Sequence, residues 1–310
     1  MVNPKYTFIL PAYKKKYLKN AIDSILAQSF GNFELIIVND ASPEDIDSVI
    51  NQYSDCRIQY HRNKTNIGGV NLVKQWNHCL SFATGEFVIL ATDDDEYAPD
   101  YLEKMSILVY KYPHVNAFRP RITHIDENNN QSGIECYMPE FSNRNLFLYF
   151  FFKRYISTGI GFWIFRRSKL LEVGGYQSMP AAWFADDVTT MALSEAGVVM
   201  SNEVLFKFRI HDQSISDQYN NEKLLNKKLQ AHTEFEMYYK SYFNKYPKTD
   251  ETIDDKTIIS LADRLNRQIW LYDISKSSKK AIIKNYKSII QTSKSSRIGT
   301  VRLIINRLFH

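Results

Sequence analysis

The sequence has little cysteine. Among its 310 residues, Cys56, Cys79 and Cys136 lie far apart and show no C-x-x-C spacing, which argues against a disulfide framework and a cysteine-based zinc site. The sequence also lacks a charged and then apolar leader at its N-terminus. Its longest apolar run, 146–152, is far too short to span a bilayer. These absences predict a protein of a reducing, cytoplasmic environment.

Charge is unevenly distributed along the chain. The net charge is +5, but residues 256–310 contain 12 Lys and Arg against 2 Asp and Glu, whereas the remaining residues contain 27 against 32. An acidic body with a basic C-terminal segment differs from a uniformly basic protein, so the composition indicates no nucleic-acid partner. With 44% hydrophobic and 24% charged residues, the composition is that of a folded soluble protein of one large or two modest domains.

The first hundred residues alternate between strand and helix patterns. Short apolar runs predict strands at 6–10, 33–38, 57–61 and 86–91. Between them, the helical spacing of apolar residues and helix-capping signals predict helices at 17–27, 42–53 and 70–82. This order predicts an α/β fold with a mostly parallel, Rossmann-like sheet flanked by helices on both faces. In such sheets, ligands bind beyond the carboxyl ends of the strands.

The chain is less regular up to residue 216 and then almost entirely helical. We therefore expect an α/β domain over 1–216, with halves 1–98 and 99–216, followed by a helical C-terminal extension over 217–310. Within the extension, one helical face gathers apolar residues with lysines beside it: Ile282, Ile283, Tyr286, Ile289 and Ile290, with Lys279, Lys280, Lys284 and Lys287. The pattern repeats over 298–308. Such helices bind anionic membrane surfaces, or pack on the α/β domain or on a second subunit.

The strongest chemical signal is a run of four acids, Asp93-Asp94-Asp95-Glu96, directly after the strand predicted at 86–91. Adjacent carboxylates repel one another, and a cation is needed to offset the cost of burying them. Mg²⁺ and Mn²⁺ bind oxygen ligands from one or two carboxylates, and phosphates complete the shell. The spacing does not fit a calcium EF-hand. The run is either a metal–diphosphate site or a solvated loop before the helix that follows Pro99.

Three further motifs are candidate functional sites, two acidic and one basic. Asp40 follows the second strand, where an acid can bind a ribose or a base or serve as a turn residue. Asp186 and Asp187 begin a helix after Trp183 and Phe184, where apolar rings and a second acid raise a carboxyl pKa and suit it to general-base work; helix-dipole stabilisation alone also explains acids there.

A late basic motif completes the set. Arg209 is a candidate pyrophosphate clamp and His211 a candidate metal or phosphate ligand, although a lone histidine is commonly a surface residue. The aromatic segment 141–155, together with Trp163 and the rings before Asp186, is either an acceptor wall or part of the core.

The order of these motifs resembles glycosyltransferase family 2, which has the GT-A fold. The similar segments are 9–13, 24–30, 34–42, 66–68 and 84–87, followed by the acids after the fourth strand, Gly174-Gly175-Tyr176, the Asp186-Asp187 pair and Arg209-x-His211. Two positions depart from the family pattern. Thr92 stands where the first Asp of the D-x-D motif is usual, and Asn39 stands where the first acid after the second strand is usual.

The resemblance implies a role for each acid. Asp40 contacts the nucleobase, Asp93 the ribose and Asp94 the metal, while Asp187 is the catalytic base. A nucleotide-sugar site and a metal site are implied around them: Pro11, Ala12, Tyr13, Asn66, Gly68, Asp186 and Arg209 for the first, and Asp95 and His211 beside Asp94 for the second. The cofactor implied is Mn²⁺ or Mg²⁺.

The implied activity is transfer of a sugar, with inversion, from a nucleotide-diphosphate sugar, a UDP-sugar in particular, to an acceptor hydroxyl. The implied acceptor is a saccharide or a lipid-linked saccharide in the synthesis of a bacterial surface polysaccharide. Two alternatives remain open. A nucleotidyltransferase of similar fold usually has a glycine-rich loop after its first strand, and residues 11–16 contain no glycine. A catalytically inactive scaffold subunit does not require both Asp94 and Asp187.

Overall fold

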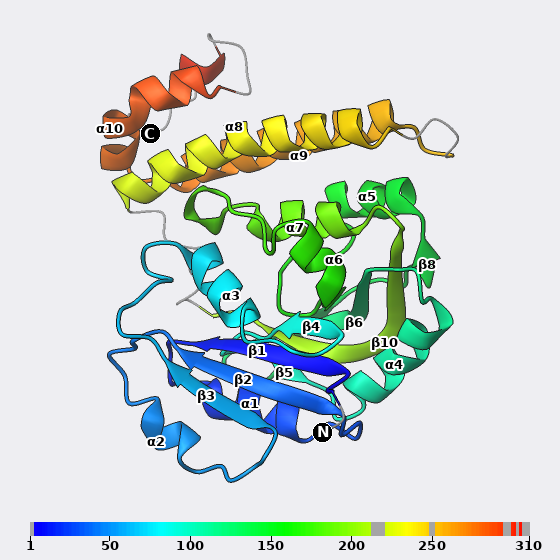
Figure 1. Cartoon of the computed structure of the whole chain (residues 1–310). Coiled ribbons are helices and arrows are strands. Elements are labelled where there is room, and N and C mark those ends of the chain that lie inside the picture. Colours follow the sequence, from blue (N-terminus) through cyan, green and yellow to red (C-terminus); the bar gives the residue numbers. More distant parts are fainter. Residues whose placement is uncertain (1–2, 212–220, 248–251, 294–298, 302–303, 306–310) are drawn as a thin grey trace.

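The computed structural model describes residues 3–211, 221–247, 252–293, 299–301 and 304–305 (Figure 1). Within these ranges a single sheet runs in the order β3-β2-β1-β4-β9-β6-β10-β5, with β7 beside β6 and β8 beside β10. The strands are β1 (Tyr6–Ala12), β2 (Phe33–Asn39), β3 (Ile58–Arg62), β4 (Phe87–Leu90), β5 (Glu96–Tyr97), β6 (Ala117–Ile125), β7 (Gln131–Ile134), β8 (Phe141–Ser142), β9 (Ile164–Arg166) and β10 (Val198–Arg209).

Helices flank this sheet, as expected for the α/β class. They are α1 (Leu18–Leu26), α2 (Asp47–Ile50), α3 (Leu72–Leu80), α4 (Tyr101–Lys111), α5 (Arg144–Phe152), α6 (Arg167–Glu172), α7 (Ala185–Leu193), α8 (Glu222–Lys245), α9 (Asp255–Lys276) and α10 (Lys279–Gln291), with a 3₁₀ turn, η1, at Pro180–Ala182. Of the helix predicted at 42–53, only α2 forms, and the Ser42 side chain accepts from the Glu44 N–H in the turn before it.

The predicted parallel sheet is found in β3, β2, β1 and β4, which pair in parallel. Beyond β4, the sheet becomes mixed, because β9 runs antiparallel to both β4 and β6. The parallel half places the carboxyl ends of β1, β2 and β4 at one edge. Residues 11–13, Asp40 and the acids from Asp93 onward therefore meet there, although they lie far apart in sequence.

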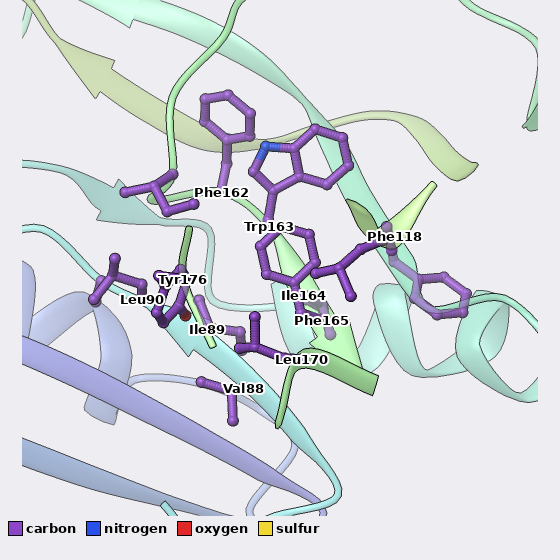
Figure 2. Packing of buried hydrophobic residues seen from close by; sticks show 14 of the residues in the cluster. Val88, Ile89, Leu90, Phe118, Phe162, Trp163, Ile164, Phe165, Leu170 and Tyr176 are labelled. Atoms are coloured by element: carbon purple, nitrogen blue, oxygen red, sulfur yellow. The ribbon is translucent and has the colours of Figure 1, made fainter. Parts of the chain in front are cut away.

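The core fills the space between the sheet and the helices. Figure 2 shows part of this core, in which Phe165 of β9 pairs with Val88 of β4 and Trp163 lies farther from β4, near Phe162. The Trp163 and Phe165 rings stack with centroids 5.6 Å apart. Four buried aromatic residues belong to this core rather than to a surface. Phe147, Phe151 and Phe152 are in α5, and Trp163 directly precedes β9. These rings of the segment that we considered as an acceptor wall are thus core, whereas Phe141 and Tyr155 are exposed.

The C-terminal helices lie across the sheet-bearing body rather than apart from it. Helices α8 and α9 run side by side above α7 and α5 (Figure 1). Phe235 of α8 stacks on Phe184, with ring centroids 4.4 Å apart, and Tyr238 donates to the Val188 carbonyl. The division of the chain at residue 216 stays a prediction, but α8 and α9 complete the same core. The second apolar stripe, over 298–308, falls partly outside the described residues.

Candidate active site

A first cavity, with a volume of about 290 Å³, lies at the carboxyl edge of the parallel strands. We call it the Asp93 cavity. It is lined by residues from the ends of β1, β2 and β4 and from the start of α3: Pro11, Tyr13, Lys14, Asp40, Asn66, Gly68, Gly69, Leu72, Gln75, Trp76, Leu90, Ala91, Thr92, Asp93, Asp94 and Ile160. Six of the predicted nucleotide-sugar residues therefore meet in one place, together with Asp94. Ala12 is buried behind them and accepts the Asp40 N–H.

Asp93 links the segment after β4, where it lies, to the loop after β1 through hydrogen bonds. Its Oδ2 accepts the backbone N–H groups of Tyr13, at 3.2 Å, and Lys14, at 2.8 Å. Burial and the neighbouring Asp94 raise the pKa of Asp93 to about 6, although the two N–H groups oppose this shift. The Asp93 carboxylate thus positions the loop after β1 as well as facing the cavity.

Asp40 organises the loop after β3. Its Oδ1 accepts from Asn63 Nδ2 and from the Ile67 N–H, and its Oδ2 accepts from the Gly68 N–H at 2.7 Å. A Cβ at Gly68 would lie 2.8 Å from that Oδ2, so only glycine allows this approach. Asn66 holds the same turn through the Gly69 N–H. Asp40 therefore shapes the cavity wall, and its predicted contact with a nucleobase remains a prediction.

The remaining acids of the run are divided between two environments. Asp94 is partly exposed, and its Oδ2 lies 2.9 Å from His211 Nε2. Asp95 is buried and accepts from Thr92 Oγ1 and from the Arg209 N–H. Burial and the charge of Asp94 raise the pKa of Asp95 well above the ordinary value. Asp94 and His211 are thus placed to share a cation, whereas Asp95 points into protein.

Arg209 serves the acidic loop itself. Its guanidinium donates to Glu96, to the carbonyl oxygens of Asp94 and Asp126, and to Asn129 Oδ1. These bonds use four of its five N–H groups, and its side chain is 1% exposed. The role of Arg209 as a pyrophosphate clamp, predicted from sequence, stays untested, but its contacts here fix the backbone that presents Asp94.

A second cavity, of about 470 Å³, adjoins the first and shares Leu72, Trp76 and Ile160 with it. We call it the Asp187 cavity. Its wall combines both acids of α7, the loop before α7 and residues of the C-terminal helices: Arg154, Thr158, Ala181, Ala182, Trp183, Phe184, Asp186, Asp187, Leu224, Lys228, Ile269 and Tyr272. Burial and the charge of Asp187 raise the pKa of Asp186 to about 7, while Arg154 opposes this shift.

The structure adds two cations that the sequence patterns do not reveal. Arg154 Nη2 lies 2.9 Å from Asp187 Oδ1. Lys228 of α8 is buried, with its Nζ 3.3 Å from Asp273 Oδ1 of α9. Neither residue belongs to a motif, because each reaches the cavity from an element distant in the chain. In the sequence, the one hint of a role for Arg154 is that Lys153 and Arg154 directly follow the apolar run 146–152.

An α/β half that gathers acids at its strand ends, beside a second cavity lined by Asp186 and Asp187, is an arrangement typical of the GT-A fold. The comparisons agree. The model of the family described as glycosyl transferase family 2 matches residues 7–174, more than half of the chain, and the chain belongs to this family.

Two relatives illustrate the match. EpsE of Bacillus subtilis is 37% identical over 115 residues, which are 36% of this chain and 40% of EpsE. The GalNAc(5)-diNAcBac-PP-undecaprenol beta-1,3-glucosyltransferase of Campylobacter jejuni is 40% identical over 96 residues, 30% of each chain. The matched part thus spans less than half of either relative.

Two solved structures share the fold over nearly the whole chain. TarS 1–349 of S. aureus in complex with UDP-GlcNAc has a TM-score of 0.67 and 13% identity, covering 98% of this chain and 89% of that one. The mannosyltransferase PcManGT of Pyrobaculum calidifontis, in complex with GDP-Man and Mn²⁺, has a TM-score of 0.53 and 14% identity, covering 99% and 88%. The α/β fold expected from sequence is confirmed.

Proposed function

We propose that this glycosyltransferase moves a sugar from a UDP-sugar to an acceptor hydroxyl with inversion, and that it needs Mn²⁺ or Mg²⁺. The observation that carries the proposal is the junction of the two cavities along Leu72, Trp76 and Ile160. The Asp93 cavity takes the nucleotide and the Asp187 cavity takes the acceptor, so the donor's anomeric carbon lies at their junction. The UDP-GlcNAc complex of the TarS fold supports uridine as the base.

The residues beside the Asp93 cavity fit a divalent cation. No group of three or more His, Cys, Asp or Glu side chains capable of holding a metal exists among the described residues. Mg²⁺ and Mn²⁺, however, bind through one or two protein ligands while substrate phosphates and water complete the shell. Asp94 and His211 supply that pair, and we prefer them to Asp95, whose oxygens are engaged. The Mn²⁺ complex of PcManGT supports a divalent cation as the cofactor.

The metal, when bound, stabilises the charge that gathers on the departing diphosphate. The chain's own contribution is the base. Asp187 accepts the proton of the acceptor hydroxyl while that oxygen bonds to the anomeric carbon and the bond to UDP breaks. We assign one base, Asp187, and no protein nucleophile, and this assignment favours a single displacement and therefore inversion.

We further propose a saccharide acceptor carried on a lipid, because the name of the Campylobacter relative includes a saccharide linked to undecaprenol. We also propose that the reaction belongs to bacterial surface polysaccharide synthesis, as the sequence resemblance implies. No described helix is long and apolar enough to cross a membrane. Helix α10 offers another contact: Ile283, Tyr286 and Ile290 are exposed on it, and it contains four lysines and no acid. We propose that this face rests on the anionic cytoplasmic leaflet. A second copy of the chain is the alternative occupant.

The proposal is tested by UDP release. The full chain is incubated with UDP-GlcNAc, UDP-glucose or UDP-galactose in MnCl₂, with and without a saccharide acceptor, and again in EDTA. We expect release from at least one donor, its loss in EDTA, and a fall of about 10²–10⁴-fold in Asp187→Asn. No release from any donor, or equal release in EDTA, would contradict the proposal.

A further inference from the structure

Arg154 makes the contact that restrains the proposed base. It lies in the turn directly after α5, and its Nη2 approaches Asp187 Oδ1 to 2.9 Å. Asp187 has a side chain only 4% exposed, and no other ion pair to it occurs in the described part of the chain. A buried carboxylate beside another acid, Asp186, requires such a cation. Arg154 is therefore tied to the charge of the α7 acid pair.

The backbone around this contact is strained. Arg154 has φ +55°, in the left-handed region that side chains with a Cβ rarely adopt. Six described residues other than glycine have positive φ, and four of them, Arg154, Ala181, Ala182 and Phe184, line the Asp187 cavity. Strain of this kind persists where the surrounding structure demands a particular side-chain placement, and it gathers at functional sites.

The wall of the Asp187 cavity also contains buried polar atoms that have no hydrogen-bond partner. Arg154 Nη1, Trp183 Nε1 and Asp187 Oδ1 are all buried and have no hydrogen-bond partner. The contact of Arg154 with Asp187 is thus an ion pair without the angle of a hydrogen bond. Since buried polar groups are nearly always satisfied, two donors and one acceptor in one cavity point to a ligand that supplies complementary oxygens.

We propose that Arg154 is a positioning residue for Asp187 and a binding residue for the acceptor. Nη2 holds the carboxylate, while Nη1 donates to an acceptor oxygen adjacent to the reacting hydroxyl, which itself donates to Asp187. This arrangement selects a sugar with two neighbouring oxygens at the reacting edge. The inference rests on the proposed function, since it presumes that Asp187 is the base.

Other charged groups face this site but do not replace Arg154. Asp186 adds negative charge from α7, Tyr272 lines the cavity from α9, and Lys228 enters it from α8. Lys228 Nζ is held by Asp273. When Arg154 is removed, Asp186 loses the positive charge that opposes the rise of its pKa, so the proton affinity of Asp186 increases.

The first test is chemical rescue. Glycine tolerates the left-handed backbone at position 154, so Arg154→Gly removes the side chain without straining the turn. We expect UDP release in MnCl₂ to fall about 10- to 100-fold and to recover in part with millimolar guanidinium chloride. Lys153→Ala, the neighbouring change, should retain activity, and guanidinium should not rescue Asp187→Asn. Full activity of Arg154→Gly, or no recovery with guanidinium, overturns the proposal.

The second test separates the two roles of Arg154. In Arg154→Gly, the acid limb of the pH profile of UDP release should move to higher pH. Arg154→Lys keeps the charge but not the planar fork, so its pH profile should stay near that of the unaltered chain, while transfer to methyl glycosides falls relative to hydrolysis. Unchanged pH profiles and transfer ratios in both variants contradict the proposal. If the unaltered chain releases no UDP, the proposed function itself has failed.

Discussion

Lys228 of α8 lies with its Nζ 3.7 Å from the centre of the Trp183 ring, and both residues line the Asp187 cavity. This contact makes the C-terminal helices part of the site. Behind it, Asp273 of α9 binds both Lys228 Nζ and His232 Nε2, and all three side chains are buried. The cluster fastens α8 to α9 at the point where they cover the cavity.

The first prediction concerns this cluster. Lys228→Met leaves the Asp273 carboxylate buried with one partner fewer, which costs about 3–5 kcal/mol when a buried pair is broken. Thermal unfolding should therefore show a marked fall in Tm. Lys227→Met, one position earlier and exposed, is the matched control and should unfold like the parent. Equal Tm values for the two variants would show that the buried pair adds nothing to stability.

The second prediction concerns the loop held by Asp40. Gly68→Ala places a methyl group 2.8 Å from Asp40 Oδ2, so the loop must shift away from the Asp93 cavity. Titration with UDP in MnCl₂ should show affinity weakened about tenfold, since roughly one hydrogen bond to a charged group is lost. Gly31→Ala meets nothing within 4 Å and should bind UDP normally. Unchanged binding by Gly68→Ala would remove the loop from the nucleotide site.

The third prediction concerns the acid pair. Burial and Asp187 raise the pKa of Asp186 to about 7, above its unfolded value of 3.8. The folded state then binds more protons than the unfolded state, so stability falls as the pH rises through this interval. Asp186→Asn removes that penalty. We expect a larger gain in Tm at about pH 8 than at about pH 5. A gain independent of pH, or a loss at pH 8, would contradict this assignment.

The fourth prediction concerns α10. Replacement of Ile283, Tyr286 and Ile290 by serine should reduce co-sedimentation with vesicles that contain phosphatidylglycerol, because the helix loses its exposed apolar stripe. Ile107→Ser with Tyr110→Ser, on exposed positions of α4, is the control and should sediment like the parent. If the parent does not sediment and is instead a dimer in sedimentation velocity, this face binds a second copy.

Sequence patterns predict the parallel half of the fold well, because β1, β2 and β4 are buried on both faces and form nearly continuous apolar runs. They also place Asp40, Asp93 and Asp94 correctly at one edge, since each follows a strand. The antiparallel return of β9 is a matter of tertiary pairing that leaves no local signal.

The sequence also gives no local signal for the two basic residues of the Asp187 cavity, because their positions depend on tertiary packing. Arg154 reaches Asp187 from 33 positions away through a left-handed turn, and Lys228 depends on how α8 crosses the body. Arg209 shows what a motif does not reveal. Its contacts with Glu96 and with nearby carbonyl oxygens depend on the fold, and its predicted contact with a phosphate stays a prediction.

The most direct test of the account is the affinity for UDP, measured by calorimetry in MnCl₂ and in EDTA, for the unaltered chain and for Asp94→Asn. We predict that chelation weakens binding at least about tenfold in the unaltered chain, and that Asp94→Asn binds weakly under both conditions. Equal affinity for UDP with and without the metal, together with normal binding by Asp94→Asn, would contradict a cation held by Asp94 against the diphosphate.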